Sequence, residues 1–183
     1  MDLGCGRGLF LDLLKEAGIH PVGVDGSPEA VAECIERGHE DTHVANVLEF
    51  LETMHEEGRK FDGVFCSHLI EHLPGRAAIQ LIVHSARILN PGGRLLISTP
   101  NAENLHVWAR QFWLDPTHIR PYPRQLIEAT MKTVGLEIAA SFDDTRGRAG
   151  GMRPKGFLRY GRAGISGQDA IVVGQQPMGQ LPG

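Results

Sequence analysis

The sequence has few cysteines, and none of them form a pair at metal-binding spacing. Its three cysteines, Cys5, Cys34 and Cys66, lie far apart in the chain and make no CxxC motif. This pattern gives no zinc site and fits a reducing compartment. We therefore expect a cytoplasmic protein.

The sequence also lacks long apolar runs and an excess of one charge. No run approaches the roughly 18 apolar residues of a membrane span, and no export leader precedes the first motif. The 18 basic and 22 acidic residues give a formal net charge of -4, so nothing draws the whole chain to nucleic acid or a membrane surface. We expect one domain over residues 1–183, with the oligomeric state open.

Apolar residues alternate between helical and strand-like spacing through the first hundred residues. The pattern predicts helices over 9–17, from 28 to 38, over 48–54 and over 79–89, and strands over 21–24, 43–45, 61–67 and 95–98. Strands that alternate with helices at short intervals indicate right-handed crossovers and a mainly parallel sheet. The predicted fold class is α/β.

The pattern changes after residue 100. Residues 101–123 are rich in aromatic residues and histidine and are predicted to form a lid or acceptor segment, whereas 1–100 form a cofactor-binding half. A helix over 124–134 and a strand from 136 follow. Residues 143–169 are basic and glycine-rich, and we expect a flexible loop there, either solvated or gripping an anion. A last strand is predicted over 170–173.

A glycine-rich turn lies at the start of the chain, between a strand end and a helix start. Asp2-Leu3-Gly4-Cys5-Gly6-Arg7-Gly8 has the spacing G-x-G-x-G, and Leu9 stands where a dinucleotide fingerprint needs its third glycine. Asp25 ends the next predicted strand, where a carboxylate can accept hydrogen bonds from a ribose diol. The alternative is a structural turn without a ligand. The two features together favour a ribose-containing ligand other than NAD.

These residues resemble the class I S-adenosylmethionine-dependent methyltransferases, particularly the type 11 and type 23 groups. The resemblance covers residues 2 to about 138 and includes Phe61-Asp62-Gly63-Val64, Ile70-Glu71-His72-Leu73 and Leu89-Asn90-Pro91-Gly92-Gly93. It implies a Rossmann-like fold with strand order 3-2-1-4-5-7-6, the last strand antiparallel. It also implies S-adenosylmethionine as cofactor and S-adenosylhomocysteine as product.

The resemblance further implies which residues hold the cofactor. The glycine turn would hold its methionine end, Asp25 its ribose, and the segment after the fourth strand would border it. Asn46 stands where the family usually has an aspartate for the adenine amino group, and its amide oxygen can accept the same bond. The predicted cofactor-binding residues are Asp2, Gly4, Cys5, Gly6, Arg7, Gly8, Asp25, Gly26, Ser27, Asn46, Val47, Cys66, Ser67 and His68.

The chain departs from the family pattern ahead of Asp2. The family normally has several apolar residues there, and this sequence has only Met1. We expect the first strand to be largely missing, because of an incomplete gene prediction or a shortened chain. The missing strand and Asn46 motivate one alternative, a non-catalytic binding or scaffold domain. A nucleotide-dependent oxidoreductase is disfavoured by Leu9.

Three histidines are candidates for chemistry. Methyl transfer from a sulfonium is an in-line displacement, and a base assists when the acceptor is a hydroxyl. His68, Glu71 and His72 are spaced to face one side of a helical turn. Some O-methyltransferases of this class place a divalent metal on two glutamates and a histidine there, with His68 replacing the first glutamate. Three alternatives stay open: a metal site, a structural His72, or a base role for His68 or His72.

The lid segment carries the candidate acceptor residues. Trp108, Phe112 and Trp113 precede Leu114–Tyr122, a run similar to the acceptor side of methyltransferases of glycan assembly. This implies O-methylation of a small-molecule or glycan-related acceptor, although aromatics at this spacing also pack lids. Asp115 lies close enough in sequence to orient His118 as a base, or the two pair structurally. The acceptor and the methylated atom stay open.

Overall fold

The computed structural model contains one seven-stranded sheet in the order β3-β2-β1-β4-β5-β7-β6. The structure describes residues 1–104, 107–143 and 169–179, so most of the predicted basic loop, 144–168, lies outside the described residues. The strands are β1 (Asp2–Leu3), β2 (Gly23–Asp25), β3 (Thr42–Val44), β4 (Phe61–Ser67), β5 (Leu89–Pro100), β6 (Glu137–Asp143) and β7 (Asp169–Gln175). The predicted strand order is confirmed, and β7 runs antiparallel to both of its neighbours.

Each predicted helix is present. The helices are α1 (Leu9–Glu16), α2 (Pro28–Glu36), α3 (Val47–Glu56), α4 (Gly75–Arg87) and α5 (Arg124–Thr133), with a short 3-10 turn η1 (Ile70–His72) after β4. Helix α4 begins and ends earlier than the predicted 79–89, and Leu89 starts β5 instead. Local chemistry fixes the start of α2. The Ser27 hydroxyl accepts a bond from the Ala30 amide at 3.2 Å, as an N-cap followed by a first-turn proline should.

The central strand β1 is short but paired on both sides. Asp2 and Leu3 pair in parallel with Gly23 and Val24 of β2, and with Phe65 and Cys66 of β4. Leu3 is completely buried. Two residues are therefore enough to place the glycine turn, which follows Leu3, between the ends of β2 and β4.

The strand β5 begins earlier than the sequence predicts. The strand was predicted over 95–98, yet β5 starts at Leu89 and includes the Asn90–Gly93 turn as an irregularity in its pairing with β4. A Cβ atom on Gly93 would lie 2.9 Å from the Asn90 carbonyl oxygen. The tight turn is thus compatible with strand pairing because its last residue is glycine.

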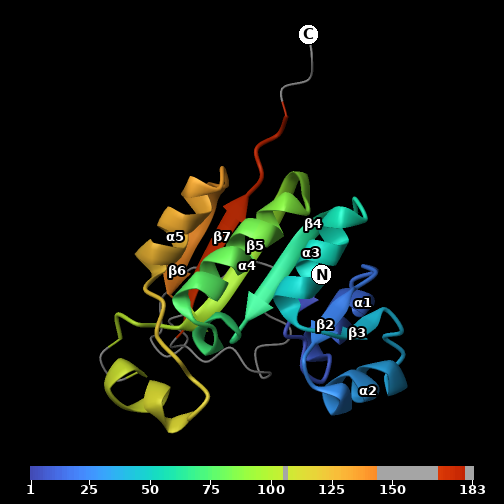
Figure 1. Cartoon of the computed structure of the whole chain (residues 1–183), viewed down its shortest axis with the longest axis horizontal. Coiled ribbons are helices and arrows are strands. Elements are labelled where there is room, and N and C mark those ends of the chain that lie inside the picture. The colour runs from blue at the N-terminus through green and yellow to red at the C-terminus, as the bar shows by residue number, and fades with distance from the viewer. Residues whose placement is uncertain (105–106, 144–168, 180–183) are drawn as a thin grey trace.

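Helices α3, α4 and α5 lie side by side over one face of the sheet (Figure 1). Because β1, β2 and β3 progress one way across the sheet and β4 and β5 the other, right-handed crossovers place α1 and α2 on the opposite face. Buried apolar side chains of the sheet and of α4, such as Leu81, Ile82, Leu95 and Ile97, form the main core. The helices cover both faces of the sheet, so the carboxyl ends of β1, β2, β4 and β5 remain available to form the site.

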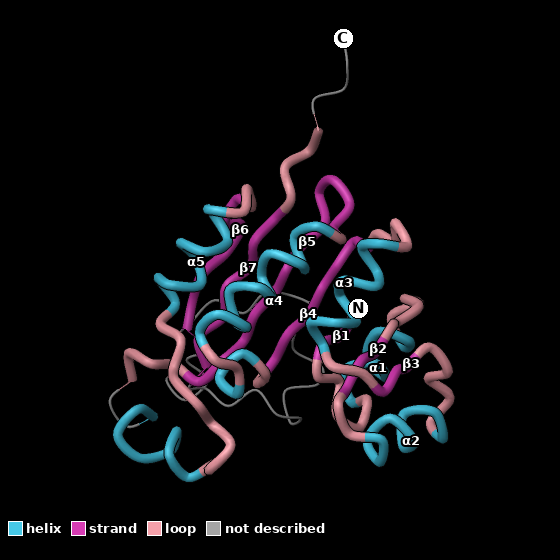
Figure 2. The backbone as a smooth tube through the Cα atoms, viewed as in Figure 1, coloured by secondary structure: helices cyan, strands magenta, loops and turns pink. Residues whose placement is uncertain are grey.

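The predicted lid segment leaves the sheet after β5 and forms two short irregular helices, η2 (Val107–Gln111) and η3 (Phe112–Leu114). It projects at the end of the sheet toward which the β4 arrow points, and then returns to α5 (Figures 1 and 2). Among the helices that the structure describes, none is both long and apolar enough to cross a membrane.

Candidate active site

The glycine turn folds back as a loop with three left-handed glycines. Gly4, Gly6 and Gly8 have φ angles of 70°, 51° and 79°, a region that residues with a Cβ rarely adopt. The Gly4 amide donates to the Val24 carbonyl at 2.8 Å, which holds the loop against β2. A Cβ on Gly6 would meet nothing within 4 Å. The loop therefore leaves open space over Gly6, at the start of α1, where helix N–H groups favour polar or anionic ligands.

Asp25 joins the loop to the end of β2. Its Oδ2 accepts a hydrogen bond from the Gly6 amide at 2.8 Å, and its Oδ1 accepts one from the Ser27 amide at 2.9 Å. Each carboxylate oxygen keeps a second lone pair for a ligand. The predicted ribose-binding carboxylate therefore also determines the shape of the loop, a role that the motif alone did not reveal.

The other predicted loop residues differ in what they present. Asp2 is buried, and burial raises the pKa of its carboxyl to about 7. Cys5 is buried too, and burial raises the pKa of its thiol. Arg7 points outward instead, with its Nε 3.5 Å from Glu33. Of these three, Asp2 and Cys5 are buried and support the loop from the protein interior, whereas Arg7 lies on the surface.

Asn46 caps α3. Its Oδ1 accepts the Leu48 amide at 2.9 Å and the Glu49 amide at 3.5 Å, so the oxygen that was expected to face an adenine amino group already has two partners. Val47 is half-buried against the core, and Gly26 is exposed beside Asp25. The cap was readable from the sequence, because an asparagine preceded a helical apolar pattern.

The end of β4 turns sharply at His68. This residue has a φ of 51°, which is uncommon for a residue with a Cβ, and its amide donates to the Ser98 carbonyl. It follows Cys66, which is buried, and Ser67, which is half-buried. A strained residue at the carboxyl edge of a sheet is often functional.

His68 lies between two buried carboxylates. Its Nε2 is 3.0 Å from Asp169 Oδ2, and its Nδ1 is 3.2 Å from Glu71 Oε1. Hydrogen bonds to Asp169 and then Glu71 raise the pKa of His68 to about 10. The imidazole is thus protonated at neutral pH, with Nε2 hydrogen-bonded to Asp169 and Nδ1 at ion-pair distance from Glu71. This geometry does not suit the base role expected for His68, and the contribution of Asp169 had no signal in the sequence.

His72 and His118 come together across the lid. Their ring centroids are 4.7 Å apart. His72 Nδ1 is 2.9 Å from Thr117 Oγ1, and His118 Nδ1 is 2.7 Å from the Phe112 carbonyl oxygen. Two of the three predicted bases therefore share one location, and in each of them Nδ1 already has a partner. Thr117 was not among the predicted site residues, although it stands beside His118.

The compact set of possible metal donors differs from the predicted one. Side-chain donor atoms of Glu71, His72 and His118 lie within 4.8 Å of one another. The predicted set of His68, Glu71 and His72 does not come together in this way, because His68 pairs with Glu71 and Asp169 while His118 takes the place beside Glu71 and His72. Glu71 also accepts a bond from the Thr99 hydroxyl at 3.0 Å. We assign no metal to this cluster.

Asp115 pairs with Thr117 more closely than with His118. Its Oδ1 accepts from the Thr117 hydroxyl at 2.5 Å and from the Thr117 amide at 2.8 Å, whereas its Oδ2 is 3.8 Å from His118 Nε2. The predicted Asp115–His118 contact is therefore long. The Thr117 bonds lower the pKa of the Asp115 carboxyl.

The lid aromatics divide into one buried ring and two exposed ones. Phe112 is 2% exposed and contacts the His118 ring, with centroids 4.5 Å apart. Trp108 and Trp113 are 39% and 54% exposed, and their centroids are 5.5 Å apart. Phe112 thus packs the lid, as one alternative expected, while the two indoles remain open to solvent.

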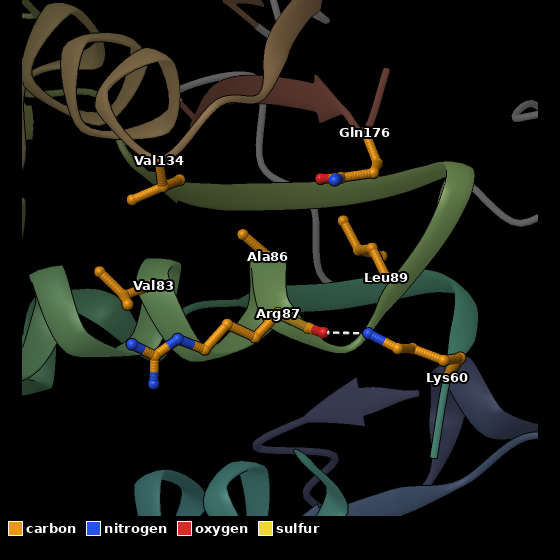
Figure 3. Close-up of a pocket in the computed structure, with 7 residues that line it drawn as sticks. All are labelled: Lys60, Val83, Ala86, Arg87, Leu89, Val134 and Gln176. Atoms are coloured by element: carbon orange, nitrogen blue, oxygen red, sulfur yellow. Dashed lines mark hydrogen bonds between the residues drawn. The ribbon is translucent and has the colours of Figure 1, made fainter. Parts of the chain in front are cut away.

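A surface cavity of about 410 Å³ lies elsewhere (Figure 3). Lys60 and Leu89, at the starts of β4 and β5, line it, so it lies at the opposite end of the strands from the glycine loop. Its other lining residues are Val83, Ala86, Arg87, Val134 and Gln176. The cavity is therefore separate from the candidate active site.

Known proteins resemble the chain in sequence. A family model described as a methyltransferase domain matches residues 1–141. A ubiquinone biosynthesis O-methyltransferase of Xylella fastidiosa (strain 9a5c) is 34% identical over 105 residues, 55% of this chain and 41% of that protein. One of Coxiella burnetii (strain Dugway 5J108-111) is 30% identical over 104 residues, 55% of this chain and 43% of that protein. The matched region is less than half of each relative's length.

Solved structures resemble the chain in fold. A SAM-dependent methyltransferase from Archaeoglobus fulgidus has a TM-score of 0.73 and 24% identity, covering 96% of this chain and 84% of that one. Magnesium protoporphyrin IX methyltransferase from Synechocystis PCC 6803, with bound SAH, has a TM-score of 0.62 and 22% identity, covering 96% and 72%. At these identities the likeness establishes the fold.

Proposed function

This chain belongs to the family of methyltransferase domains, and from that membership we propose that it transfers a methyl group from S-adenosylmethionine to a hydroxyl oxygen of a small acceptor. One observation carries the proposal. Asp25 accepts the Gly6 amide, so a carboxylate and an open glycine loop meet at the carboxyl ends of β1 and β2. That arrangement suits a ligand with a ribose and a polar tail.

The residues present fit the cofactor. The open space over Gly6 admits the methionine end, and the free lone pairs of Asp25 accept from the ribose hydroxyls. Asn46 and Val47, which the family resemblance assigns to the adenine, follow the end of β3 and begin α3. When bound, S-adenosylmethionine supplies an electrophilic methyl group on a sulfonium. The protein then has to hold the acceptor oxygen in line with that methyl and remove its proton.

The imidazoles of His72 and His118 are suited to the proton transfer. Each has its Nδ1 occupied, by Thr117 or by the Phe112 carbonyl, which leaves an Nε2 as the acceptor when the ring is neutral. The curated relatives are named O-methyltransferases, which supports oxygen as the methylated atom. A positioned base contributes roughly 10² to 10⁴ in rate for such acceptors.

Turnover with methyl-labelled S-adenosylmethionine tests this proposal directly. Purified protein is incubated with the labelled cofactor and a panel of phenols, catechols and saccharides, and label in the acceptor is measured. We expect label on a hydroxyl oxygen. Cofactor binding without label in any acceptor would support the non-catalytic domain instead, and a nicotinamide-dependent absorbance change would support an oxidoreductase.

For the acceptor itself, a glycan-related hydroxyl is supported by the exposed pair Trp108 and Trp113. Indole faces stack on the C–H face of a sugar ring, and this pair lies on the lid that carries His118.

Trp108 and Trp113 are the two tryptophans of the chain. Tryptophan fluorescence therefore reports on this surface alone. We expect saccharide acceptors to change the fluorescence saturably, and Trp113→Ala to raise the acceptor KM while SAH affinity stays within about twofold, because Trp113 lies on the lid and is not one of the predicted cofactor-binding residues.

The buried free thiols of Cys5, Cys34 and Cys66 support the prediction of a cytoplasmic location. Expression of a tagged chain in cells, followed by cell fractionation, tests that assignment.

A further inference from the structure

Thr117 links the lid to the end of β4 through one side-chain contact. Its Oγ1 lies 2.9 Å from His72 Nδ1, although the two residues are 45 positions apart. His72 ends the turn η1 directly after β4, and Thr117 belongs to the lid segment after η3. The backbone keeps the two parts close, because the Ile119 amide donates to the Glu71 carbonyl at 2.8 Å. This backbone hydrogen bond thus keeps Thr117 and His72 close to each other.

The direction of the hydrogen bonds follows from counting protons. A threonine hydroxyl has one proton, and Thr117 donates it to Asp115 Oδ1 at 2.5 Å. Asp115 cannot donate in return, because the bonds from Thr117 lower the pKa of its carboxyl and keep it ionised. The Thr117 oxygen must therefore accept a proton from His72 Nδ1. In a neutral His72 the lone pair is then on Nε2.

His118 provides an internal comparison. Its Nδ1 donates to a backbone carbonyl, that of Phe112, at 2.7 Å, and its ring is therefore in the same tautomer. A main-chain partner is present whatever the side chains are. His72 differs, because its tautomer depends on the hydroxyl of one residue and the carboxylate of another. A single substitution can therefore remove the control over His72 and leave His118 unchanged.

We propose that Thr117, supported by Asp115, is a positioning residue that holds His72 in the tautomer able to take a proton from the acceptor hydroxyl. The inference rests on the proposed methyl transfer. In that step the acceptor oxygen forms a bond to the methyl carbon, and the carbon–sulfur bond breaks with its electron pair kept by sulfur. The acceptor O–H proton moves to His72 Nε2. The Nδ1–H···Thr117···Asp115 chain then stabilises the imidazolium that forms.

Three variants test the role of the hydroxyl. Thr117→Val removes it at nearly constant volume, Thr117→Ser keeps it, and Thr130→Val is a matched control because Thr130 bonds only within α5, to the Leu126 carbonyl. With the acceptor found in the labelling assay, we expect Thr117→Val to lower kcat about 10- to 100-fold, within the range for loss of a positioned base. The SAH affinity should stay within about twofold, Thr117→Ser should recover most of the rate, and Thr130→Val should match the parent.

A measurement of the tautomer separates this inference from the proposed function. Nitrogen-15 NMR of the SAH-bound protein reports which imidazole nitrogen of His72 carries the proton, and it needs no acceptor. We expect a proton on Nδ1 in the parent and in Thr117→Ser, and a mixture of tautomers in Thr117→Val. A proton on Nε2 in the parent, or equal rates in the parent and a folded Thr117→Val, would overturn the inference. Failure of SAH to bind would instead count against the proposed function.

Discussion

The glycine loop and the lid segment lie at the same end of the sheet but are built from different parts of the chain. In the loop, three left-handed glycines and hydrogen bonds from backbone amides determine the shape. The carboxylate that holds the loop is that of Asp25, on the adjacent strand and 19 residues from Gly6 in sequence. In the lid, side chains determine the shape, through contacts such as Thr117 with His72 and Phe112 with His118.

This difference separates binding of a common cofactor from choice of an acceptor. A backbone-built loop tolerates few substitutions, because each glycine is required for its φ angle or for space. A side-chain-built lid can exchange its residues on the same frame, which is how one fold serves many substrates. The two parts should therefore respond differently to substitution.

The largest effect is expected at Gly8. Its φ is 79°, and a Cβ there would lie 2.9 Å from the buried Cys34 sulfur. We expect Gly8→Ala to lower the free energy of unfolding by about 3 kcal/mol, from backbone strain and overpacking together, and to weaken SAH binding strongly. Chemical denaturation measures the first effect and calorimetry the second.

Gly58→Ala is the matched control for Gly8→Ala. Gly58 has a φ of 68° with nothing within 4 Å of an added Cβ. It should lose only about 1 kcal/mol, the strain alone, with normal SAH binding. Equal losses in the two variants would mean that the space beside Cys34 is not a constraint on the loop.

An intermediate effect is expected at His68, where a side chain bridges β4 and β7. Replacing it by Gln leaves the buried Glu71 and Asp169 without their cation, and we expect a loss of about 2 kcal/mol at neutral pH. Because the folded-state pKa of His68 is raised to about 10, its contribution is complete below its ordinary pKa of 6.5 and is lost as pH rises toward 10. Unfolding curves at a series of pH values test this.

The difference in stability between the parent and His68→Gln should therefore be largest near pH 6 and shrink steadily as the pH approaches about 10. His20→Gln, at an exposed position, is the control and should show no such trend. A difference that grows with pH would contradict the assigned pairing.

The smallest effect is expected at Asn46. Asn46→Ala removes the cap of α3 and should cost about 1 kcal/mol, whereas Asn46→Asp keeps an acceptor at the cap and should be nearly neutral for stability. Because the family usually has an aspartate there, Asn46→Asp should leave SAH affinity equal or slightly higher. Thermal unfolding and calorimetry of the pair decide this, and a tenfold loss of affinity in Asn46→Asp would be inconsistent with an adenine-side role.

The sequence predicted the loop side of this comparison far better than the lid side. Periodicity placed the helices, and the glycine spacing with Asp25 predicted a nucleoside-type site, because both depend on residues that are close in sequence. The strand order, confirmed here, came from the family resemblance. The early start of β5 was missed because a turn motif was included in a strand.

The lid side depends on contacts that no local pattern encodes. His68 was a candidate base, yet Asp169, about a hundred residues later, pairs with it and makes it a cation. Asp115 was expected to orient His118, yet it bonds to Thr117, which reaches His72 instead. The first outcome depends on where β7 joins the sheet and the second on how the lid folds back over η1, so residue spacing alone could not distinguish the alternatives.

The central claim is that Asp25 and the glycine loop form an S-adenosylmethionine site. Calorimetric titration of the purified protein with S-adenosylhomocysteine, beside Asp25→Ala and the surface control Asp41→Ala, tests it most directly. We expect saturable binding in the parent and in Asp41→Ala, and binding at least about 100-fold weaker in Asp25→Ala, because two bonds to a charged group are lost and the loop is released. Equal affinity in the parent and Asp25→Ala, or no binding in the parent, would contradict the claim.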